Sequence, residues 1–217
     1  DESILEYQHG ESKLISEGAH TLDQIAMPPA LTGTQCAYCP TQNHVDEYGM
    51  RDGRTYDPQN PYSYRDYRFY ANVLYDGTTF RDSVMEMHYV IDASGKEVAQ
   101  SGITKYGTGR NNGYSRTGYY MRKFLDPKIT YPYKEKEGSN QNYPIWRYAE
   151  LLLDYAEAAF RTGDVSIALQ KVNLVRQRVK MHPLTSITLN DILNERRVEM
   201  AFEETTYWDE IRLGTAV

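Results

Sequence analysis

A chain of 217 residues is long enough to bury a hydrophobic core, and its 40% hydrophobic and 25% charged residues are typical of a globular protein. The formal net charge of −6, without a long basic stretch, gives no electrostatic basis for binding a phosphate backbone, so nucleic acid is excluded as a partner. No apolar run approaches the ~20 residues that cross a bilayer. The 20 Tyr, against 5 Phe and 2 Trp, indicate rings that meet water or a polar ligand.

The first part of the chain, residues 1–142, is dense in Gly, Pro, Asn, Asp and Tyr, which predicts short strands between long loops. Short apolar and aromatic runs predict strands at Ile4–Tyr7, Phe69–Leu74 and Met85–Ile91. Loops of this length in a compact protein usually carry function. We therefore expect residues 1–142 to be a loop-rich ligand-binding region with short strands.

The two cysteines, Cys36 and Cys39, are compatible with a tight disulfide, half of a zinc site or two unpaired thiols. A zinc site needs a fourth ligand that is not evident, although His44 is near. A disulfide or two free thiols in a loop is therefore the expectation, and we predict no cofactor.

From Tyr143 onward, apolar residues recur at three- and four-residue steps, which predicts helices in residues 143–217. Pro144 suits the first turn of one helix, and Gly163 suits its C-terminal cap. Asp164 is expected to cap a second helix to about Lys180. Two helices joined by so short a turn must pack antiparallel, and together they approach the ~34 residues of a tetratricopeptide unit.

A third helix is expected to begin at Thr188, where Thr188 and Asp191 resemble a capping box, and to run through Glu204. Its many charges indicate either ion pairs between helices, with Arg147 or Arg212, or a solvated face of little energetic value. Both tryptophans fall in periodic helical stretches and are expected in the core, namely Trp146 and Trp208.

The chain contains three stretches in a fixed order. They are PTQNHVDEYGMRDGRTYDPQNPYSYRDYRFYANVLYDG from Pro40, TGYYMRKFLDP from Thr117, and PIWRYAELLLDYAEAAFRTGDVSIALQKVNLVRQR followed by ILNERRVEMAFEETTYWDEIRLG. The first contains counterparts of PTQ, Y-x-M-x-DG and N-x-R-D-P-R-F segments. Together they resemble the SusD/RagB family of outer-membrane nutrient-binding lipoproteins. The chain departs from the family pattern at Tyr67, where Pro is common, at Thr205 and Thr206, which interrupt a Glu-Gly-x-Arg, and at Leu213, where Trp is frequent.

The resemblance implies a mainly α, SusD-like fold, in which tetratricopeptide-type helical hairpins support a loop-rich ligand-binding region with short strands. Residues 1–142 and 143–217 would form one continuous SusD-like unit that is incomplete at both ends. The protein would lie on the outer surface of the outer membrane, anchored by lipid through a residue outside this chain. It would deliver a captured oligosaccharide or polysaccharide to a SusC-like TonB-dependent transporter, or alternatively bind peptide.

Sugar capture needs flat rings for the C–H face of a pyranose and amide, carboxylate or guanidinium groups for its hydroxyls. Tyrosines beside such groups lie in the stretch around PTQ, in the Asp57–Asp66 loop and in the glycine-rich Tyr106–Tyr120 loop. In the resembled family, the loop before PTQ helps to form the ligand face. The candidate ligand-binding residues are Tyr38, Gln42, Tyr64, Tyr106, Arg110, Asn112 and Tyr114.

Catalysis has no supporting motif in this sequence. There is no G-x-S-x-G, no H-E-x-x-H and no phosphate-binding loop, and the five histidines are scattered. A secreted glycoside hydrolase with a pair of carboxylates is the remaining enzymatic alternative. Asp46, Asp52 and Asp57 lack the spacing of an EF-hand calcium loop and are expected to terminate turns. We therefore predict a binding protein, not an enzyme.

Overall fold

The computed structural model describes residues 2–26, 36–87, 90–91, 93–95, 97–98, 115–128 and 138–215. The chain forms two compact units, each assembled from segments that are distant in sequence. Unit 1 contains residues 1–7, 43–71 and 144–217, and unit 2 contains residues 8–42 and 72–143. Among the described residues, no helix combines the length and the apolarity needed to cross a membrane.

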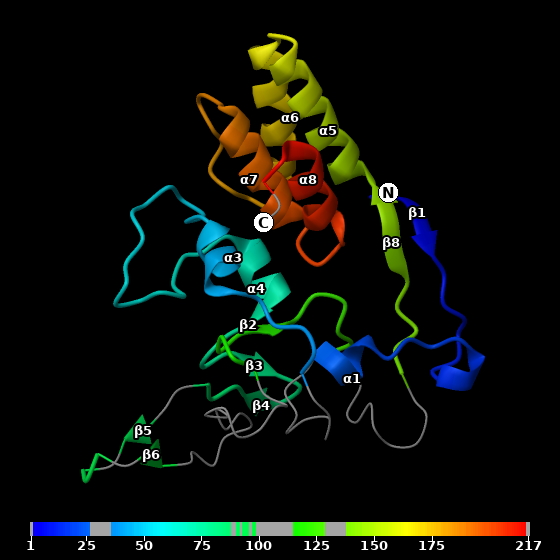
Figure 1. The fold of residues 1–217 in the computed structure, drawn as a ribbon, viewed down its shortest axis with the longest axis vertical. Coiled ribbons are helices and arrows are strands. Elements are labelled where there is room, and N and C mark those ends of the chain that lie inside the picture. The colour runs from blue at the N-terminus through cyan, green and yellow to red at the C-terminus, as the bar shows by residue number, and fades with distance from the viewer. Residues whose placement is uncertain are drawn as a thin grey trace. The chain divides into compact units, whose positions relative to one another are not determined.

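Unit 1 is mainly helical, and Figure 1 shows its elements by label. Strands β1 (Ser3–Tyr7) and β8 (Tyr143–Arg147) pair in a two-stranded sheet. The helices that lie mostly in this unit are α3 (Gln42–Glu47), α4 (Tyr67–Asn72), α5 (Tyr148–Arg161), α6 (Val165–Arg178), α7 (Leu189–Glu199) and α8 (Thr205–Leu213).

Unit 2 has little regular structure and consists of short elements joined by loops. Its elements are the 3-10 helix η1 (Ile15–Glu17), helix α1 (Leu22–Ala26) and strands β2 (Val73–Leu74), β3 (Thr79–Phe80), β4 (Ser83–Val84), β5 (Val90–Ile91), β6 (Glu97–Val98) and β7 (Tyr120–Met121). Strand β2 pairs antiparallel with β7, β3 with β4 and β5 with β6. The β2–β7 pair, which places Leu74 opposite Tyr120, is buried on both strands.

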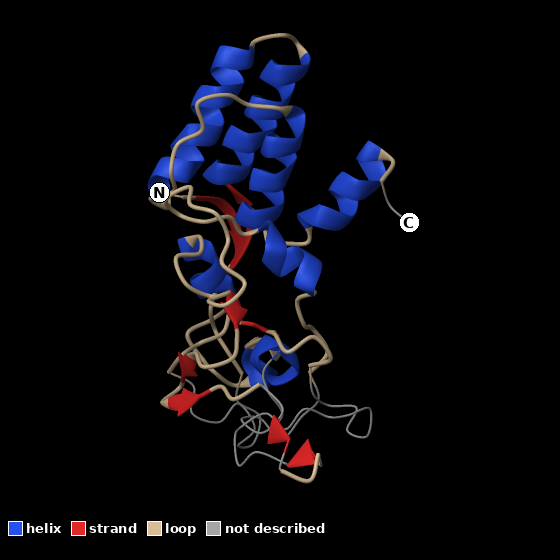
Figure 2. Ribbon diagram, turned by 90° about the vertical axis from the view of Figure 1, so that its left-hand side faces the viewer, coloured by secondary structure: helices blue, strands red, loops and turns tan. Residues whose placement is uncertain are grey.

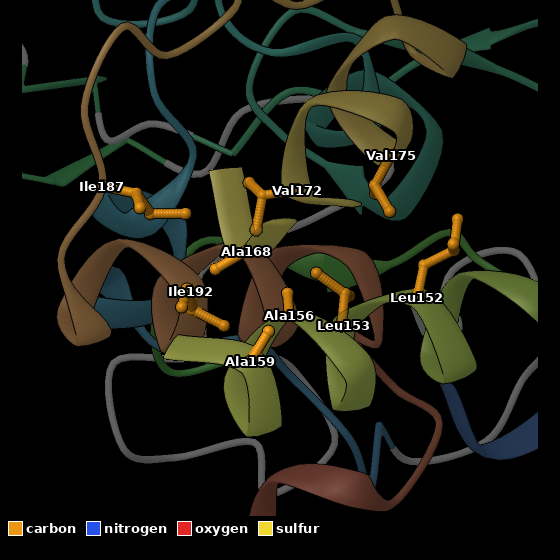
Figure 3. Packing of buried hydrophobic residues seen from close by; sticks show 9 residues of the cluster. All are labelled: Leu152, Leu153, Ala156, Ala159, Ala168, Val172, Val175, Ile187 and Ile192. Atoms are coloured by element: carbon orange, nitrogen blue, oxygen red, sulfur yellow. The ribbon is translucent and has the colours of Figure 1, made fainter. Parts of the chain in front are cut away.

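The core of unit 1 lies between α5 and α6 and is completed by α7. Leu153, Ala156, Ala168 and Val172 are fully buried where the two long helices meet, and Ile192 of α7 points into the same cluster (Figure 3). Alanines on both helices let their backbones approach closely. Gly163 follows the last turn of α5 with a φ of 94°, the left-handed conformation that ends a helix. The predicted antiparallel hairpin is confirmed.

Helix α7 begins as predicted and ends early. The Thr188 hydroxyl accepts a hydrogen bond from the Asp191 backbone N–H at 3.2 Å, and the Asp191 carboxylate accepts one from the Thr188 N–H at 2.8 Å. The capping box is therefore confirmed. The prediction that the helix continues to Glu204 is wrong, because Phe202 and Glu204 adopt left-handed φ angles of 66° and 61°, which no right-handed helix accommodates.

Both tryptophan predictions are wrong. Trp146 lies in strand β8 and is 42% exposed, because α5 begins at Tyr148 and not at Pro144. Trp208 of α8 is 66% exposed. Figure 2 shows α8 standing apart from the bundle of α5, α6 and α7, and α8 turns Asp209 and Arg212 toward these helices instead of its aromatic residues.

The strand predictions for the first part of the chain are confirmed in part. Strand β1 occupies Ser3–Tyr7, as expected for Ile4–Tyr7. Phe69–Leu74 is mostly helix α4, and only Val73 and Leu74 form a strand. In Met85–Ile91, residues 85–87 are irregular, residues 88 and 89 lie outside the described residues, and β5 covers the end. Apolar runs this short do not distinguish a helical turn from a strand.

Buried ion pairs join the separate segments of unit 1. The Arg147 guanidinium contacts Glu199 at 2.6 Å and Glu203 at 2.7 Å, and the Arg68 guanidinium contacts Glu199 at 2.9 Å and Glu195 at 2.7 Å. Burial alone would raise the pKa of Glu199, but the surrounding arginines outweigh it and lower that pKa to about 2. The predicted ion pairs between helices are confirmed, and the alternative of a solvated face is wrong.

Candidate ligand-binding surface

The first candidate surface belongs to unit 2 and starts at the segment from Cys36 to Gln42. The Ala37 backbone N–H donates to the carbonyl of Ile25 in α1 at 2.7 Å, which fixes the segment just before Tyr38. The Tyr38 side chain is 54% exposed. A ring exposed to this degree on a fixed backbone presents an aromatic face without a large ordering cost.

The same segment is held at its other end by residues near β7. The Thr117 hydroxyl donates to the carbonyl of Pro40 at 2.6 Å, and the Tyr119 hydroxyl donates to the side-chain oxygen of Gln42 at 2.9 Å. Tyr119 is buried, so its ring positions Gln42 and is not available to stack on a ligand. Gln42 is exposed, but its side-chain oxygen is engaged by Tyr119 and its amide orientation is therefore set.

The two cysteines flank Tyr38 as unbonded thiols. The Cys36 thiol donates a hydrogen bond to the carbonyl of Tyr38 at 3.1 Å. Burial, followed by the neighbouring Cys39, raises the pKa of the Cys36 thiol to about 12. Such a thiol carries little thiolate at neutral pH and is a poor nucleophile. Within the described ranges, no group of three potential ligands could hold a metal ion.

The second candidate surface belongs to unit 1 and is the loop between α3 and α4, drawn in cyan in Figure 1. Residues 50–51 and 64–65 lie side by side where the loop begins and ends, and we call this part of the loop its neck. An antiparallel bridge joins Met50 to Arg65, and the Arg51 N–H donates to the Tyr64 carbonyl at 3.0 Å. The Tyr70 hydroxyl donates to the Tyr62 carbonyl at 2.6 Å and accepts from the Arg65 N–H at 3.1 Å. The loop is therefore anchored at both ends.

At this neck, the guanidinium groups of two arginines lie over the rings of two exposed tyrosines. The guanidinium of Arg54 lies 3.5 Å from the ring centroid of Tyr64, and that of Arg51 lies 4.9 Å from the same centroid and 5.0 Å from the centroid of Tyr67. Tyr64 and Tyr67 are each 45% exposed. Arg54 is also paired with the Asp52 carboxylate at 2.5 Å. Because Arg54 covers it, the ring of Tyr64 is not a bare platform for a sugar.

Three other residues in or beside this loop have structural roles. The Tyr62 ring stacks on Phe69 with centroids 6.0 Å apart. Arg68 is buried and binds Asp66 at 2.6 Å, so it braces the chain and does not face a ligand. The Asp57 carboxylate accepts from the Gln59 N–H at 2.9 Å, as expected of a residue that terminates a turn.

The structure tests the positions of three candidate ligand residues only. Tyr38 and Gln42 lie close in sequence in unit 2, and Tyr64 lies in unit 1. The other four fall outside the described residues, namely Tyr106, Arg110, Asn112 and Tyr114. The sequence did not indicate the supporting roles of Thr117 and Tyr119, nor the two arginines that cover Tyr64.

Comparisons with known proteins relate this chain to a family. A model described as the SusD family matches residues 1–216. A SusD-like protein of Bacteroides ovatus is 39% identical over 71 residues, which are 31% of this chain and 13% of that protein. A SusD-like protein of Formosa agariphila is 32% identical over 89 residues, which are 35% of this chain and 18% of that protein.

Solved structures agree with this match. A SusD-like carbohydrate-binding protein from Bacteroides fragilis superposes with a TM-score of 0.73 at 28% identity. The superposition covers 98% of this chain and 42% of the Bacteroides fragilis chain. This chain therefore spans less than half the length of that relative.

Proposed function

This chain belongs to the SusD family, and from that premise we propose that it captures glycan at the cell surface without altering it. The observation that supports this proposal is the exposed Tyr38 ring, four positions before the exposed Gln42, on a backbone that hydrogen bonds hold at both ends. The ring can stack on the C–H face of a pyranose, and the amide of Gln42 can meet its hydroxyls. The carbohydrate-binding relative from Bacteroides fragilis supports the choice of glycan as ligand.

Capture by a few exposed rings gives modest affinity. Stacking removes apolar area worth roughly 25 cal/mol per Å², from which the cost of ordering the ligand is subtracted. A receptor of modest affinity releases its cargo readily. This suits our proposal that the protein, anchored by lipid through a residue outside residues 1–217, passes glycan to a SusC-like TonB-dependent transporter.

Exposed aromatic residues on the helices support a protein partner of this kind. Tyr148 and Tyr155 of α5 are each 48% exposed, and Tyr207 and Trp208 of α8 are 62% and 66% exposed. Large exposed apolar side chains that gather on helices are typical of protein interaction sites. We propose that the helices face the transporter while the loops face the glycan.

The test is a glycan and peptide array, followed by titration of the glycans that bind. Tyr38→Ala should weaken glycan binding by about tenfold, equivalent to ~1.4 kcal/mol, with an unchanged circular dichroism spectrum. Tyr207→Ala is the matched control, since it removes a tyrosine ring of similar exposure from a helix and should leave glycan affinity unchanged. Binding of peptides alone would contradict the glycan proposal, and sustained release of shortened glycan would contradict a non-catalytic role.

A further inference from the structure

We infer that Arg51 forms a subsite for anionic groups, so that the captured glycan is an acidic one bearing carboxylate or sulfate ester groups. This inference rests on the proposed glycan-binding function and names its substrate class. It concerns the neck of the loop between α3 and α4, which unit 1 contains in full.

The Arg51 guanidinium is held by rings and not by acids. It lies 4.9 Å from the ring centroid of Tyr64 and 5.0 Å from that of Tyr67. In the described part of the chain, no carboxylate forms an ion pair with Arg51, and its side chain is half-buried. An aromatic ring is a weak hydrogen-bond acceptor, so a guanidinium beside rings keeps N–H groups that can bind a stronger acceptor. Arg51 therefore retains the capacity to donate hydrogen bonds to an incoming anion.

Most other arginines of unit 1 are paired with carboxylates, whereas Arg65 is buried and donates to the backbone carbonyls of Val45 and Pro61. Arg54, only three positions away, is paired with Asp52 at 2.5 Å. Arg196 contacts Asp209 at 2.6 Å, and Arg212 contacts Glu157 at 2.7 Å. A buried arginine needs carboxylate or carbonyl partners, because its charge is costly to bury alone. Arg51 is half-buried and, among the described residues, its guanidinium has neither a carboxylate nor a carbonyl partner, so its N–H groups remain available to a ligand.

The neck is ordered before any ligand arrives. The Met50–Arg65 bridge and the hydrogen bond from the Arg51 N–H to the Tyr64 carbonyl fix the backbones of both partners. Tyr64 adopts a φ of 56°, a left-handed conformation that costs a non-glycine residue free energy. This conformation occurs where the Tyr64 ring meets two guanidinium groups. A preordered subsite binds more tightly than one that must order itself on binding.

Carboxylate and sulfate groups both match the N–H edge of a guanidinium, which can donate two parallel hydrogen bonds to them. The Tyr67 ring, which Arg54 does not cover, supplies the apolar surface against which the sugar that carries the anion can lie. The hydroxyls of a neutral sugar can accept hydrogen bonds from Arg51, but these bonds are weaker than those that the guanidinium donates to an anion. The neck therefore discriminates in favour of acidic glycans, such as those with uronic acids or sulfated sugars.

The experiment measures affinity for four matched probes by calorimetry at low and high salt. The probes are a galacturonic acid hexasaccharide, its fully methyl-esterified form, a sulfated galactan hexasaccharide and its desulfated form. We expect the acidic form of at least one pair to bind about tenfold more tightly, with a preference that shrinks as salt rises. Arg51→Gln should remove that preference, while Arg54→Gln, the matched control, should retain most of it.

Each outcome decides one proposal. Preference for the galacturonate pair identifies a carboxylate ligand, and preference for the galactan pair identifies a sulfate ligand. Glycan binding without preference for either acidic probe overturns the inference and leaves the glycan-binding function standing. An acidic preference that survives in Arg51→Gln also overturns the inference. If the protein binds none of the probes and no glycan on the array, the proposed function fails and the inference fails with it. A melting temperature equal to wild type shows that Arg51→Gln is folded.

Discussion

Two regions of unit 1 use arginine in opposite ways. Around α7, the guanidinium groups of Arg68, Arg147 and Arg196 are buried, and each contacts two or more carboxylates. At the neck of the loop between α3 and α4, Arg51 and Arg54 lie over exposed tyrosine rings. The first arrangement joins segments that are distant in sequence. The second leaves polar edges accessible at the surface.

The two groups of arginines differ in what stabilises their positive charge, which is carboxylates around α7 and mainly water at the neck. A buried guanidinium without a carboxylate would be strongly destabilising, so the network around α7 tolerates little change. A guanidinium at a half-exposed site is solvated, so stability does not demand an acid beside it. Loss of a charge from the buried network should therefore lower stability, whereas changes at the neck should alter binding.

The largest expected effect is that of Glu199→Gln. The Glu199 carboxylate contacts Arg147, Arg68 and Arg178, and its removal takes away the one negative charge that these three guanidinium groups share, so that buried positive charge is less fully compensated. We expect the free energy of unfolding to fall by ~3–5 kcal/mol, measured by urea denaturation. Asp154→Asn is the matched control, because its side chain is 50% exposed although it pairs with Arg196. A change of only ~0–1 kcal/mol is expected there. Equal losses in both variants would contradict the comparison.

A smaller effect is expected from pH at Glu157 of α5. Hydrogen bonds from Arg212, and then from Arg161, outweigh burial and lower the pKa of Glu157 from 4.5 to about 2. Because the folded pKa lies below the unfolded one, the stabilisation is complete above the unfolded pKa and is lost as pH falls toward about 2.

The measurement is urea denaturation from neutral pH down to about pH 2, close to the folded pKa. Glu157→Gln should be less stable than wild type at neutral pH, and the difference should shrink as the pH falls. Some acid sensitivity should persist in the variant, because Glu199 has a similarly lowered pKa. A difference between the two proteins that is independent of pH would show that Glu157 acts through packing and not through its charge.

Local sequence patterns predicted contacts between helices where the same side chain both lies on an apolar stripe and allows two helices to approach closely. Ala156 and Ala168 lie on periodic apolar stripes and also allow close helix approach, so the α5–α6 hairpin was predictable. The capping box of α7 was also predictable, because it involves only Thr188 and Asp191, which are close in sequence. Trp146 follows the same helical period but pairs as part of β8 with β1, a partner more than a hundred residues away. Local periodicity contains no information about such a partner.

The sequence predicted which loops carry the candidate surfaces, but it did not predict the contacts that their side chains make. Tyr38 and Tyr64 were identified by residue type and loop position, and both are exposed. The hydrogen bond from Tyr119 to Gln42 joins residues 77 positions apart, and no local pattern specifies it. The sequence does not show which of Arg51 and Arg54 pairs with the Asp52 carboxylate. Only the structure shows that the partner is Arg54.

A modest effect is expected from Tyr67→Pro, which restores the residue common at this position in the resembled family. Tyr67 is the first residue of α4, where proline is well tolerated, and Asp66 caps the helix by accepting from the Arg68 N–H at 2.8 Å. Stability should change by less than ~0.5 kcal/mol in urea denaturation. Affinity for the preferred acidic probe should fall by about threefold, because one of the two rings that orient Arg51 is lost. Unchanged affinity for that probe would show that Tyr64 alone orients the guanidinium.

The smallest expected effect is a gain of affinity in Asp52→Asn. The Asp52 carboxylate occupies the guanidinium of Arg54 and places a negative charge beside the neck. Its removal should free Arg54, which remains stacked on Tyr64, and should strengthen binding of the preferred acidic probe by about two- to threefold at low salt. Asp57→Asn is the matched control, since that exposed acid of the same loop binds Asn60 and not an arginine. Equal gains in the two variants would mean that general repulsion by acids, and not the occupation of Arg54, limits anion binding at the neck.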